Sequence, residues 1–235
     1  MQAENQKLIE ELKERNATLE KQNIILAKRI EESTKNLTQL YADLRSTYMR
    51  TIKALAQAID ARDHYTHSHS ENVAKFAVAI AQEMGLSARE IETIGEACEL
   101  HDLGKIGIED NILGKDAALS EEEWEQIKRH PVIGAKILEP LTFLNDVTEL
   151  IRQHHEHYDG SGYPEGRRQE DILLGARIIQ LADAYESMCS ARSYRKVPLS
   201  KEEAIQEVKK NSGKQFDPKV VEVFLRIEDK LQKLI

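Results

Sequence analysis

The sequence predicts an all-α protein in which a long N-terminal helix precedes a globular helical domain. Apolar residues recur at helical spacing along most of the 235 residues, and no stretch alternates convincingly between apolar and polar residues as a strand would. Residues 1 to about 48 contain neither proline nor glycine, the residues that most often interrupt a helix. One loop rich in glycine and proline, DGSGYPEG, runs from Asp159 to Gly166. We therefore expect helices throughout, separated by short connections and by this longer loop.

The N-terminal segment repeats in sevens, with mostly apolar residues at the first and fourth positions of the repeat, a and d. Position a holds Ile9, Asn16, Asn23, Ile30, Leu37 and Leu44, and position d holds Asn5, Leu12, Leu19, Leu26, Ser33, Leu40 and Thr47. This apolar stripe is narrow and includes polar residues, which favours a coiled coil over a helix that lies on its own domain. Asn16 and Asn23 can each meet their own copy only in a parallel, in-register pair. We predict a coiled coil over residues 1–48 that forms a homodimer, and a helical domain over residues 49–235.

Further helices follow one another after about residue 50. The first carries apolar residues around Leu55 on one face, and the second passes through Val73 and stops near Gly85. The pattern Ser-x-x-Glu at Ser120 is a capping box, which predicts the start of another helix. The remaining helices are expected over residues 88–103, 145–157, 175–190, 201–210 and 218–233.

Composition and charge argue against several classes of protein. Apolar residues make up 40% of the chain and charged residues 31%, as in a globular protein. The net charge of −8, without a basic stripe, argues against a general binder of nucleic-acid polymers. No apolar run is long enough to span a membrane, and the two cysteines, Cys98 and Cys189, lie far apart. These features predict a cytoplasmic protein without membrane insertion, in which an anionic substrate is attracted locally by metal ions and a few cations.

Two pairs of residues supply the first sign of chemistry, His101-Asp102 and His154-His155. Imidazoles and carboxylates without thiolates match a site for iron, manganese or zinc. Each pair is a weak signal by itself. His154 and His155 would point about 100° apart on a helix, so that one could be exposed while the other packs or caps.

Three further residues strengthen this signal. His69 lies on the second predicted helix, and His130 is expected to end the helix that begins at Ser120. Asp183 lies in the middle of a helix among isoleucine, leucine and alanine, where a carboxylate is costly to bury unless a cation meets it. That cation could be a metal ion or the nearby Arg177. The combination of all these residues favours the metal ion.

Five stretches together resemble the HD-GYP branch of the HD phosphohydrolase superfamily. They are ALAQAIDARDHYTHSHSENVA, LHDLGKIGI, IKRHPVIGAKIL, HHEHYDGSGYPEG and LADAYESMCSARSYRK. The resemblance extends from about Leu55 to Phe224 and keeps the order of the family's motifs, whereas the N-terminal heptads lie outside it. The combination of HDLGK with HHEHYDGSGYP is highly specific. The resemblance implies a helical, metal-dependent phosphohydrolase.

The resemblance also implies that two divalent metal ions, iron or manganese, are bound by seven residues. These are His69, His101, Asp102, His130, His154, His155 and Asp183. In the family the residue that matches Asp102 bridges the two metals, so Asp102 is expected to be catalytic. Some relatives bind a third metal through a glutamate, but Tyr65 stands at that position here. A neutral phenol is a poorer ligand than a carboxylate, so two metals are expected.

Four residues are expected at the substrate. Lys105 matches a family residue that can contact a phosphate or the departing oxygen, Arg192 and Arg195 match positions that hold phosphates, and Tyr163 belongs to the GYP loop. The implied reaction is hydrolysis of the 3′–5′ phosphodiester of cyclic di-GMP to pGpG, with GMP as a further product. The implied protein partners are a diguanylate cyclase of the GGDEF type or an upstream sensor domain.

The match departs from the family's pattern at several positions near the expected metal site. Ser68 replaces a usual glycine, Asn72 replaces a usual arginine, and Glu99 replaces a usual apolar residue. None of them removes a ligand, but two alternatives to the enzyme stay open: a silent receptor of cyclic di-GMP and an HD hydrolase of another nucleotide. A purely structural helical module is the least favoured alternative. Trp124 is expected to pack rather than to bind guanine.

Overall fold

The computed structural model describes residues 1–62, 69–115, 117–190 and 197–231 of the chain. Within these residues all regular secondary structure is helical, apart from one isolated β-bridge between Ser212 and Phe216. The predicted all-α fold class is therefore confirmed. Four of the residues singled out from the sequence lie outside the described residues: Tyr65, Ser68, Arg192 and Arg195.

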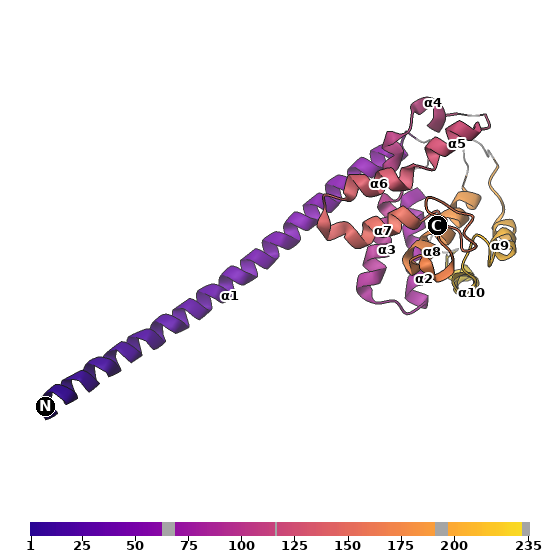
Figure 1. The fold of residues 1–235 in the computed structure, drawn as a ribbon. Coiled ribbons are helices and arrows are strands. Elements are labelled where there is room, and N and C mark those ends of the chain that lie inside the picture. The colour runs from indigo at the N-terminus through magenta and orange to yellow at the C-terminus, as the bar shows by residue number, and fades with distance from the viewer. Residues whose placement is uncertain (63–68, 116, 191–196, 232–235) are drawn as a thin grey trace. The chain divides into compact units, whose positions relative to one another are not determined.

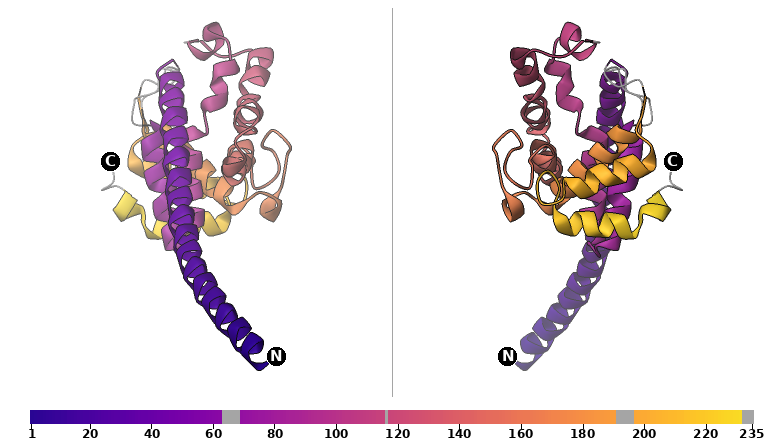
Figure 2. Two further views of the ribbon diagram at one scale, coloured as in Figure 1. Left: turned by 90° about the vertical axis from the view of Figure 1, so that its left-hand side faces the viewer. Right: turned by 90° about the vertical axis from the view of Figure 1, so that its right-hand side faces the viewer.

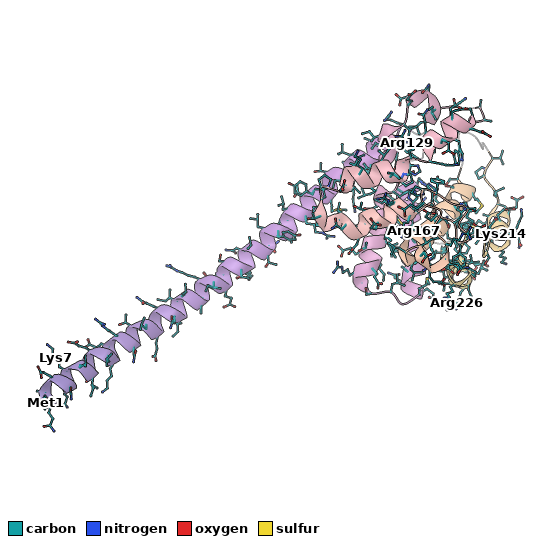
Figure 3. The ribbon with its side chains drawn as sticks, in the orientation of Figure 1. Met1, Lys7, Arg129, Arg167, Lys214 and Arg226 are labelled. Atoms are coloured by element: carbon teal, nitrogen blue, oxygen red, sulfur yellow. The ribbon has the colours of Figure 1, made fainter. Side chains whose placement is uncertain are left out.

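The chain divides into two compact units, residues 1–51 and 52–235. The first unit consists of most of α1 (Gln2–Asp60), a helix of 59 residues whose last turns belong to the second unit (Figure 1). Side chains project from all sides of α1 (Figure 3), and its apolar residues in the first unit are largely exposed, as Leu19 is at 54%. In the part of the chain that the structure describes, no helix is long and apolar enough to cross a membrane. The coiled coil stays a prediction.

Three helices that lie side by side form the centre of the second unit (Figures 1 and 2). They are α2 (His69–Glu83), α3 (Ala88–Leu100) and α8 (Leu174–Cys189). Apolar residues at intervals of three and four positions give α2 a buried face, in which Phe76 is fully buried. His69, the first residue of α2, is buried as well. The packing of α2 therefore carries a polar side chain into the interior at one end.

Short helices connect α3 to α8. They are η1 (Leu103–Gly107), α4 (Asp110–Leu113), α5 (Glu121–Ile127), α6 (His130–Leu138), η2 (Thr142–Leu144), α7 (Asn145–Gln153) and η3 (Gln169–Asp171). Ile108, Ile112 and Leu113 form an apolar cluster against which Ile127 and Ile133 pack. This cluster joins α4 to α5 and α6, so the segment that carries His130 is fixed by apolar contacts.

Of the three C-terminal helices, the first two pack against α8 and the last packs against the second. They are α9 (Lys201–Lys210), α10 (Pro218–Arg226) and α11 (Glu228–Leu231). Arg177 on α8 forms a buried ion pair with Asp217, which caps the N-terminus of α10. The alternative in which Arg177 is the cation that meets Asp183 is therefore wrong.

Candidate metal centre

The His101-Asp102 pair lies in a tight turn between α3 and η1, and both side chains are buried. Gly104 makes this turn close-packed, because a Cβ added there would lie 1.9 Å from the carbonyl oxygen of His130. A residue without a side chain therefore lets η1 lie directly against the start of α6. The result is that Asp102 Oδ1 lies 3.5 Å from His130 Nε2.

His130 begins α6 instead of ending the helix that starts at Ser120, so the predicted boundary is wrong. The preceding helix ends at Ile127, and Pro131 occupies the first turn of α6, where its missing N–H is not needed. The side chain nevertheless faces the other candidate ligands. His130 Nδ1 lies 2.7 Å from the carbonyl oxygen of Ile127, and Nε2 lies 3.3 Å from Nε2 of His154.

His154 and His155 follow α7 instead of lying on it. The helix expected over residues 145–157 ends at Gln153, so the expectation that the two imidazoles diverge along a helix is wrong. Their rings lie 4.1 Å apart, and the ring of His130 lies 5.3 Å from the first and 5.0 Å from the second. Three imidazoles therefore converge at this end of the site.

His69 and Asp183 form the opposite end of the site. The Nε2 atom of His69 lies 3.3 Å from Asp183 Oδ1, and His101 Nε2 lies 4.0 Å from the same oxygen. His69 Nδ1 lies 2.5 Å from Oε2 of the buried Glu186, whose Oε1 accepts a hydrogen bond of 2.6 Å from Ser190 Oγ. Glu186 was not identified from the sequence. Its signal was a second carboxylate three residues after Asp183, on the same face of an apolar helix.

The structure brings all seven predicted ligands together. Each belongs to at least one of three overlapping groups, in which the possible ligand atoms lie within 4.8 Å of one another. The groups are His69, His101 and Asp183; His101, Asp102 and His154; and His130, His154 and His155. Imidazole nitrogens and carboxylate oxygens form a donor set that suits iron, manganese or zinc. These residues can therefore hold a divalent metal ion.

Asp102 connects the two ends of the site. Its Oδ2 lies 3.4 Å from His101 Nε2 and its Oδ1 lies 3.5 Å from His130 Nε2, so one oxygen faces each end. Lys105 Nζ donates to Oδ2 at 2.7 Å and is buried, so Lys105 is not a solvated surface lysine. Burial opposes ionisation of Asp102, but the charges of His101 and Lys105 outweigh burial and hold its pKa well below the usual range.

Backbone carbonyls orient three of the imidazoles. The Nδ1 atoms of His101, His130 and His154 lie 2.7, 2.7 and 2.5 Å from the carbonyl oxygen of the residue three positions earlier. A carbonyl oxygen can only accept, so each Nδ1 carries a hydrogen, and Nε2 presents its lone pair whenever the ring is neutral. Burial lowers the pKa of His130 to about 4 and that of His154 to about 3, which keeps both rings neutral near neutral pH. Both rings are therefore ready to act as ligands.

Glu156 holds the loop Asp159–Gly166 against the site. Its carboxylate is buried and accepts backbone hydrogen bonds from Glu165 at 2.7 Å and from Arg167 at 2.9 Å. Two backbone donors on one carboxylate fix the end of the loop more firmly than contacts between exposed side chains would. Like Glu186, this buried carboxylate was not identified from the sequence.

Tyr163 lies against the candidate ligand His155. A Cβ added to Gly162 would lie 2.4 Å from the carbonyl oxygen of His155, so glycine permits a close approach of the two backbones. The backbone N–H of Tyr163 donates to that oxygen at 3.1 Å, and its ring lies 4.8 Å from the ring of His155. Trp124 is 45% exposed, and its ring lies 6.5 Å from that of Tyr163.

Two described departures from the family's pattern leave the candidate ligands in place. Asn72 is buried on α2 and accepts a hydrogen bond of 3.2 Å from Lys75. Glu99 forms an ion pair with Lys53, near the end of α1. Both polar side chains therefore have partners of their own.

Comparisons with known proteins support the arrangement of the second unit. The sequence model of the family described as HD domain matches residues 53–220, a range that includes all seven predicted ligands. A cyclic di-GMP phosphodiesterase of Thermotoga maritima is 38% identical over 201 residues, which cover 84% of this chain and 54% of that protein. A cyclic di-GMP phosphodiesterase response regulator of Xanthomonas campestris is 38% identical over 186 residues, 78% of this chain and 49% of that protein. The chain spans about half the length of these relatives.

A solved structure shows the same fold. A cyclic GMP-AMP-specific phosphodiesterase of Vibrio cholerae aligns with a TM-score of 0.61 and 23% identity, over 77% of this chain and 48% of that chain. At this level of identity the likeness concerns the helical arrangement and not the substrate.

Proposed function

Because this chain belongs to the HD domain family, we propose that it is a metal-dependent phosphodiesterase that hydrolyses the 3′–5′ phosphodiester of cyclic di-GMP. The product is linear pGpG, with GMP as the product of a second cleavage. The proposal rests on the position of Asp102, which directs one oxygen toward each end of a cluster of imidazoles and carboxylates. The two relatives named for cyclic di-GMP support the choice of substrate.

Two divalent ions, iron or manganese, are assigned to the two ends of the site. One belongs to His69, His101 and Asp183, the other belongs to His130, His154 and His155, and Asp102 lies between them. When bound, such a pair of ions supplies a water activated for attack and neutralises charge on the phosphodiester. Local positive charge of this kind is what an acidic protein with a net charge of −8 needs in order to bind an anionic ester.

The protein's own side chains position the substrate around this centre. Lys105 brings a positive charge into the buried site, where it can stabilise the charge that develops on the leaving oxygen. Arg192 and Arg195 are assigned to the substrate's phosphates, for which the planar guanidinium is well suited. Burial raises the pKa of the Tyr163 phenol, so its hydroxyl stays a neutral hydrogen-bond donor.

A hydrolysis assay separates this function from its two alternatives. Chromatography of the products formed by the manganese- or iron-loaded protein should show pGpG from cyclic di-GMP. The value of kcat/KM should be higher for cyclic di-GMP than for 3′3′-cyclic GMP-AMP, the kind of substrate for which one structural relative is named. Tight binding of cyclic di-GMP without product would favour a silent receptor. Faster cleavage of the mixed dinucleotide would favour a hydrolase of another nucleotide.

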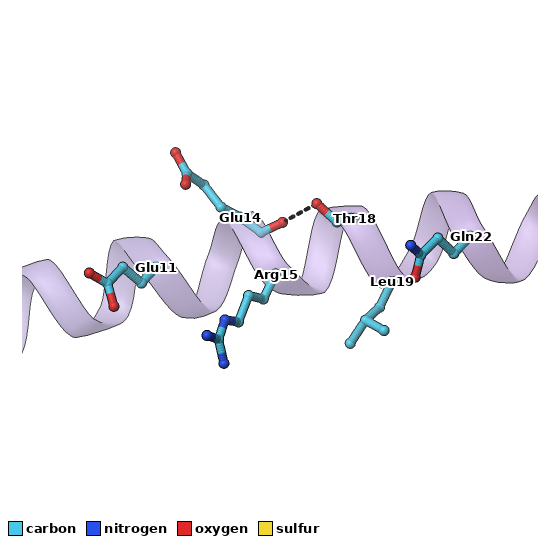
Figure 4. Close-up of a pocket in the computed structure, with 6 residues that line it drawn as sticks. All are labelled: Glu11, Glu14, Arg15, Thr18, Leu19 and Gln22. Atoms are coloured by element: carbon cyan, nitrogen blue, oxygen red, sulfur yellow. Dashed lines mark hydrogen bonds between the residues drawn. The ribbon is translucent and has the colours of Figure 1, made fainter.

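The exposed apolar stripe of α1 supports a second proposal, a parallel two-stranded coiled coil over residues 5–47 that makes the protein a homodimer. Figure 4 shows Arg15 and Leu19 on the same side of α1. In the dimer Leu19 would be covered by its own copy, and Arg15 would meet Glu20 of the second chain. Light scattering should give the mass of a dimer for the full chain, and a monomeric full chain would end this proposal.

Two further proposals concern the regulatory partner of the protein and its location in the cell. A diguanylate cyclase of the GGDEF type or an upstream sensor domain is proposed as the regulatory partner, on the strength of the family resemblance. The cytoplasmic location is proposed from the two widely separated cysteines, Cys98 and Cys189. Cys98 is fully buried and Cys189 is partly buried, and neither forms a disulfide, as expected in a reducing compartment.

A further inference from the structure

Trp124 is the single tryptophan of the chain, and its side chain is 45% exposed on α5. The helix is held by other residues, because Ile127 packs on the apolar cluster of Ile108, Ile112 and Leu113, of which Trp124 is not a part. One exposed aromatic residue means little by itself. The rings around Trp124 make its position informative.

Aromatic rings connect Trp124 to the candidate metal centre. The ring of Trp124 lies 6.5 Å from that of Tyr163 at an angle of 79°, and the ring of Tyr163 lies 4.8 Å from that of His155. The ring of His155 in turn lies 4.1 Å from that of His154. Trp124 and Tyr163 meet edge to face. In such a contact Tyr163 covers at most one face of the indole, so at least one face is left uncovered by Tyr163. The rings therefore form a continuous wall from the buried ligands to an exposed indole.

We propose that Trp124 and Tyr163 form a subsite for a purine base of the cyclic dinucleotide, which stacks on the indole while a phosphate lies at the metal centre. This inference rests on the proposed function and adds a specific contact to it. Each phosphate of a cyclic dinucleotide is joined through ribose to a base, so a substrate held at the centre carries a base close to its phosphate. Stacking needs an aromatic surface, and the rings of Trp124 and Tyr163 supply one beside the polar centre.

Because stacking is available to every base, this subsite should raise affinity for a purine dinucleotide without distinguishing guanine from adenine. Cyclic di-GMP and 3′3′-cyclic GMP-AMP should therefore depend on Trp124 to a similar extent. Replacing one stacking side chain changes nucleotide affinity by roughly 5- to 150-fold. This role replaces the expectation that Trp124 only packs.

The fluorescence of Trp124 tests the subsite directly, because no other tryptophan contributes to the emission. The full-length, metal-loaded protein would be titrated with a hydrolysis-resistant phosphorothioate analogue of cyclic di-GMP, and calorimetry would define saturation. We expect saturable quenching by the analogue and no quenching by inorganic phosphate, which occupies the centre without supplying a base. Unchanged emission at saturation, or no binding of the analogue, would overturn the proposal.

Kinetics of matched variants supply the second test. Trp124→Ala should raise KM for cyclic di-GMP about 10-fold with little change in kcat, and Trp124→Phe should keep most of the affinity. Methyl p-nitrophenyl phosphate, which carries no base, should be cleaved equally by Trp124→Ala and the wild type. Ile137→Ala removes another part-exposed apolar side chain, from α6, and should leave both reactions unchanged.

The outcomes distinguish the base subsite from the proposed function. Equal KM values for cyclic di-GMP in the wild type and in Trp124→Ala would overturn the subsite alone. Failure of the wild type to cleave either ester would overturn the proposed function, and the emission experiment, which needs no turnover, would still decide the subsite.

Discussion

The two ends of the candidate metal centre hold their imidazoles in different ways. At one end, burial lowers the pKa of His69, but hydrogen bonds to Asp183 and Glu186 outweigh burial and raise it to about 9. At the other end, backbone carbonyls orient His130 and His154, and burial lowers their pKa values to about 4 and 3. One end is therefore rich in carboxylates, whereas the other consists mainly of neutral imidazoles.

The two ends therefore differ in how they can be tested. A side-chain partner of an imidazole can be removed by one substitution, whereas a backbone partner cannot. The carboxylate of Glu186 can be removed while α8 stays in place, but the carbonyls of Ile127 and Ile151 cannot be removed from the backbone. A site with more carboxylates also attracts a divalent cation more strongly. We therefore expect the end with His69 and Asp183 to bind its ion more tightly than the other end.

The largest effect is expected from Asp102→Ala, because Asp102 faces both ends of the site. Loss of this carboxylate should abolish detectable hydrolysis of cyclic di-GMP and release both ions, while the circular dichroism of the helices stays the same. Metal analysis and product chromatography would measure both effects. Asp171→Ala, at an exposed aspartate, is the control. Near-full activity in Asp102→Ala would show that the assignment of the active site to this cluster is wrong.

Asp183→Asn and His130→Gln should separate the two ends. Each variant should retain one of the two ions and lose most hydrolysis, because the reaction needs both. Crystals of each variant soaked in manganese should locate the remaining ion at the end that was not changed. If either variant kept both ions at full occupancy, the division of the ligands between two ends would have to be abandoned.

Glu186→Gln should weaken only the end that contains His69. Removal of a partner that orients a ligand imidazole typically lowers metal affinity by about 10- to 100-fold. A calorimetric titration should therefore show one weakened binding step and one unchanged step. Ser190→Ala, which leaves the carboxylate of Glu186 in place, should have a smaller effect. Equal weakening of both steps would argue for a general loss of structure instead of a local one.

Smaller and more selective effects are expected from the cations assigned to the substrate. Arg192→Ala and Arg195→Ala should mainly raise KM, each through loss of a phosphate contact of about 1.5–3 kcal/mol. Lys105→Ala should mainly lower kcat, if its charge meets the leaving oxygen. Steady-state kinetics with cyclic di-GMP would separate the two. Small and equal effects from all three substitutions would mean that none of the three side chains contacts the substrate.

The seven candidate ligands that the structure brings together could be selected from the sequence, because they occur in pairs and motifs whose order resembles one family. The HD domain match over residues 53–220 confirms that resemblance at the level of the family. The periodicity of apolar residues also sufficed for the all-α class and for Asp183 in the middle of α8.

Helix boundaries at the site were less predictable, because they depend on tertiary contacts. A proline often follows the end of a helix, but Pro131 lies in the first turn of the next helix, a position that suits proline equally well. The helical pattern continues past Gln153, yet the side chain of Gln153 accepts a hydrogen bond of 2.9 Å from the backbone of Leu173, a contact between distant segments. Glu186 was missed for the same reason, since its partner His69 is 117 residues away.

An anomalous-scattering map of the manganese-loaded, full-length protein tests the central claim most directly. Two peaks are predicted, one among His69, His101 and Asp183 and the other among His130, His154 and His155. Asp102 should contact both ions. A single peak, a third fully occupied peak, or manganese bound away from Asp102 would contradict a two-ion centre bridged by this carboxylate.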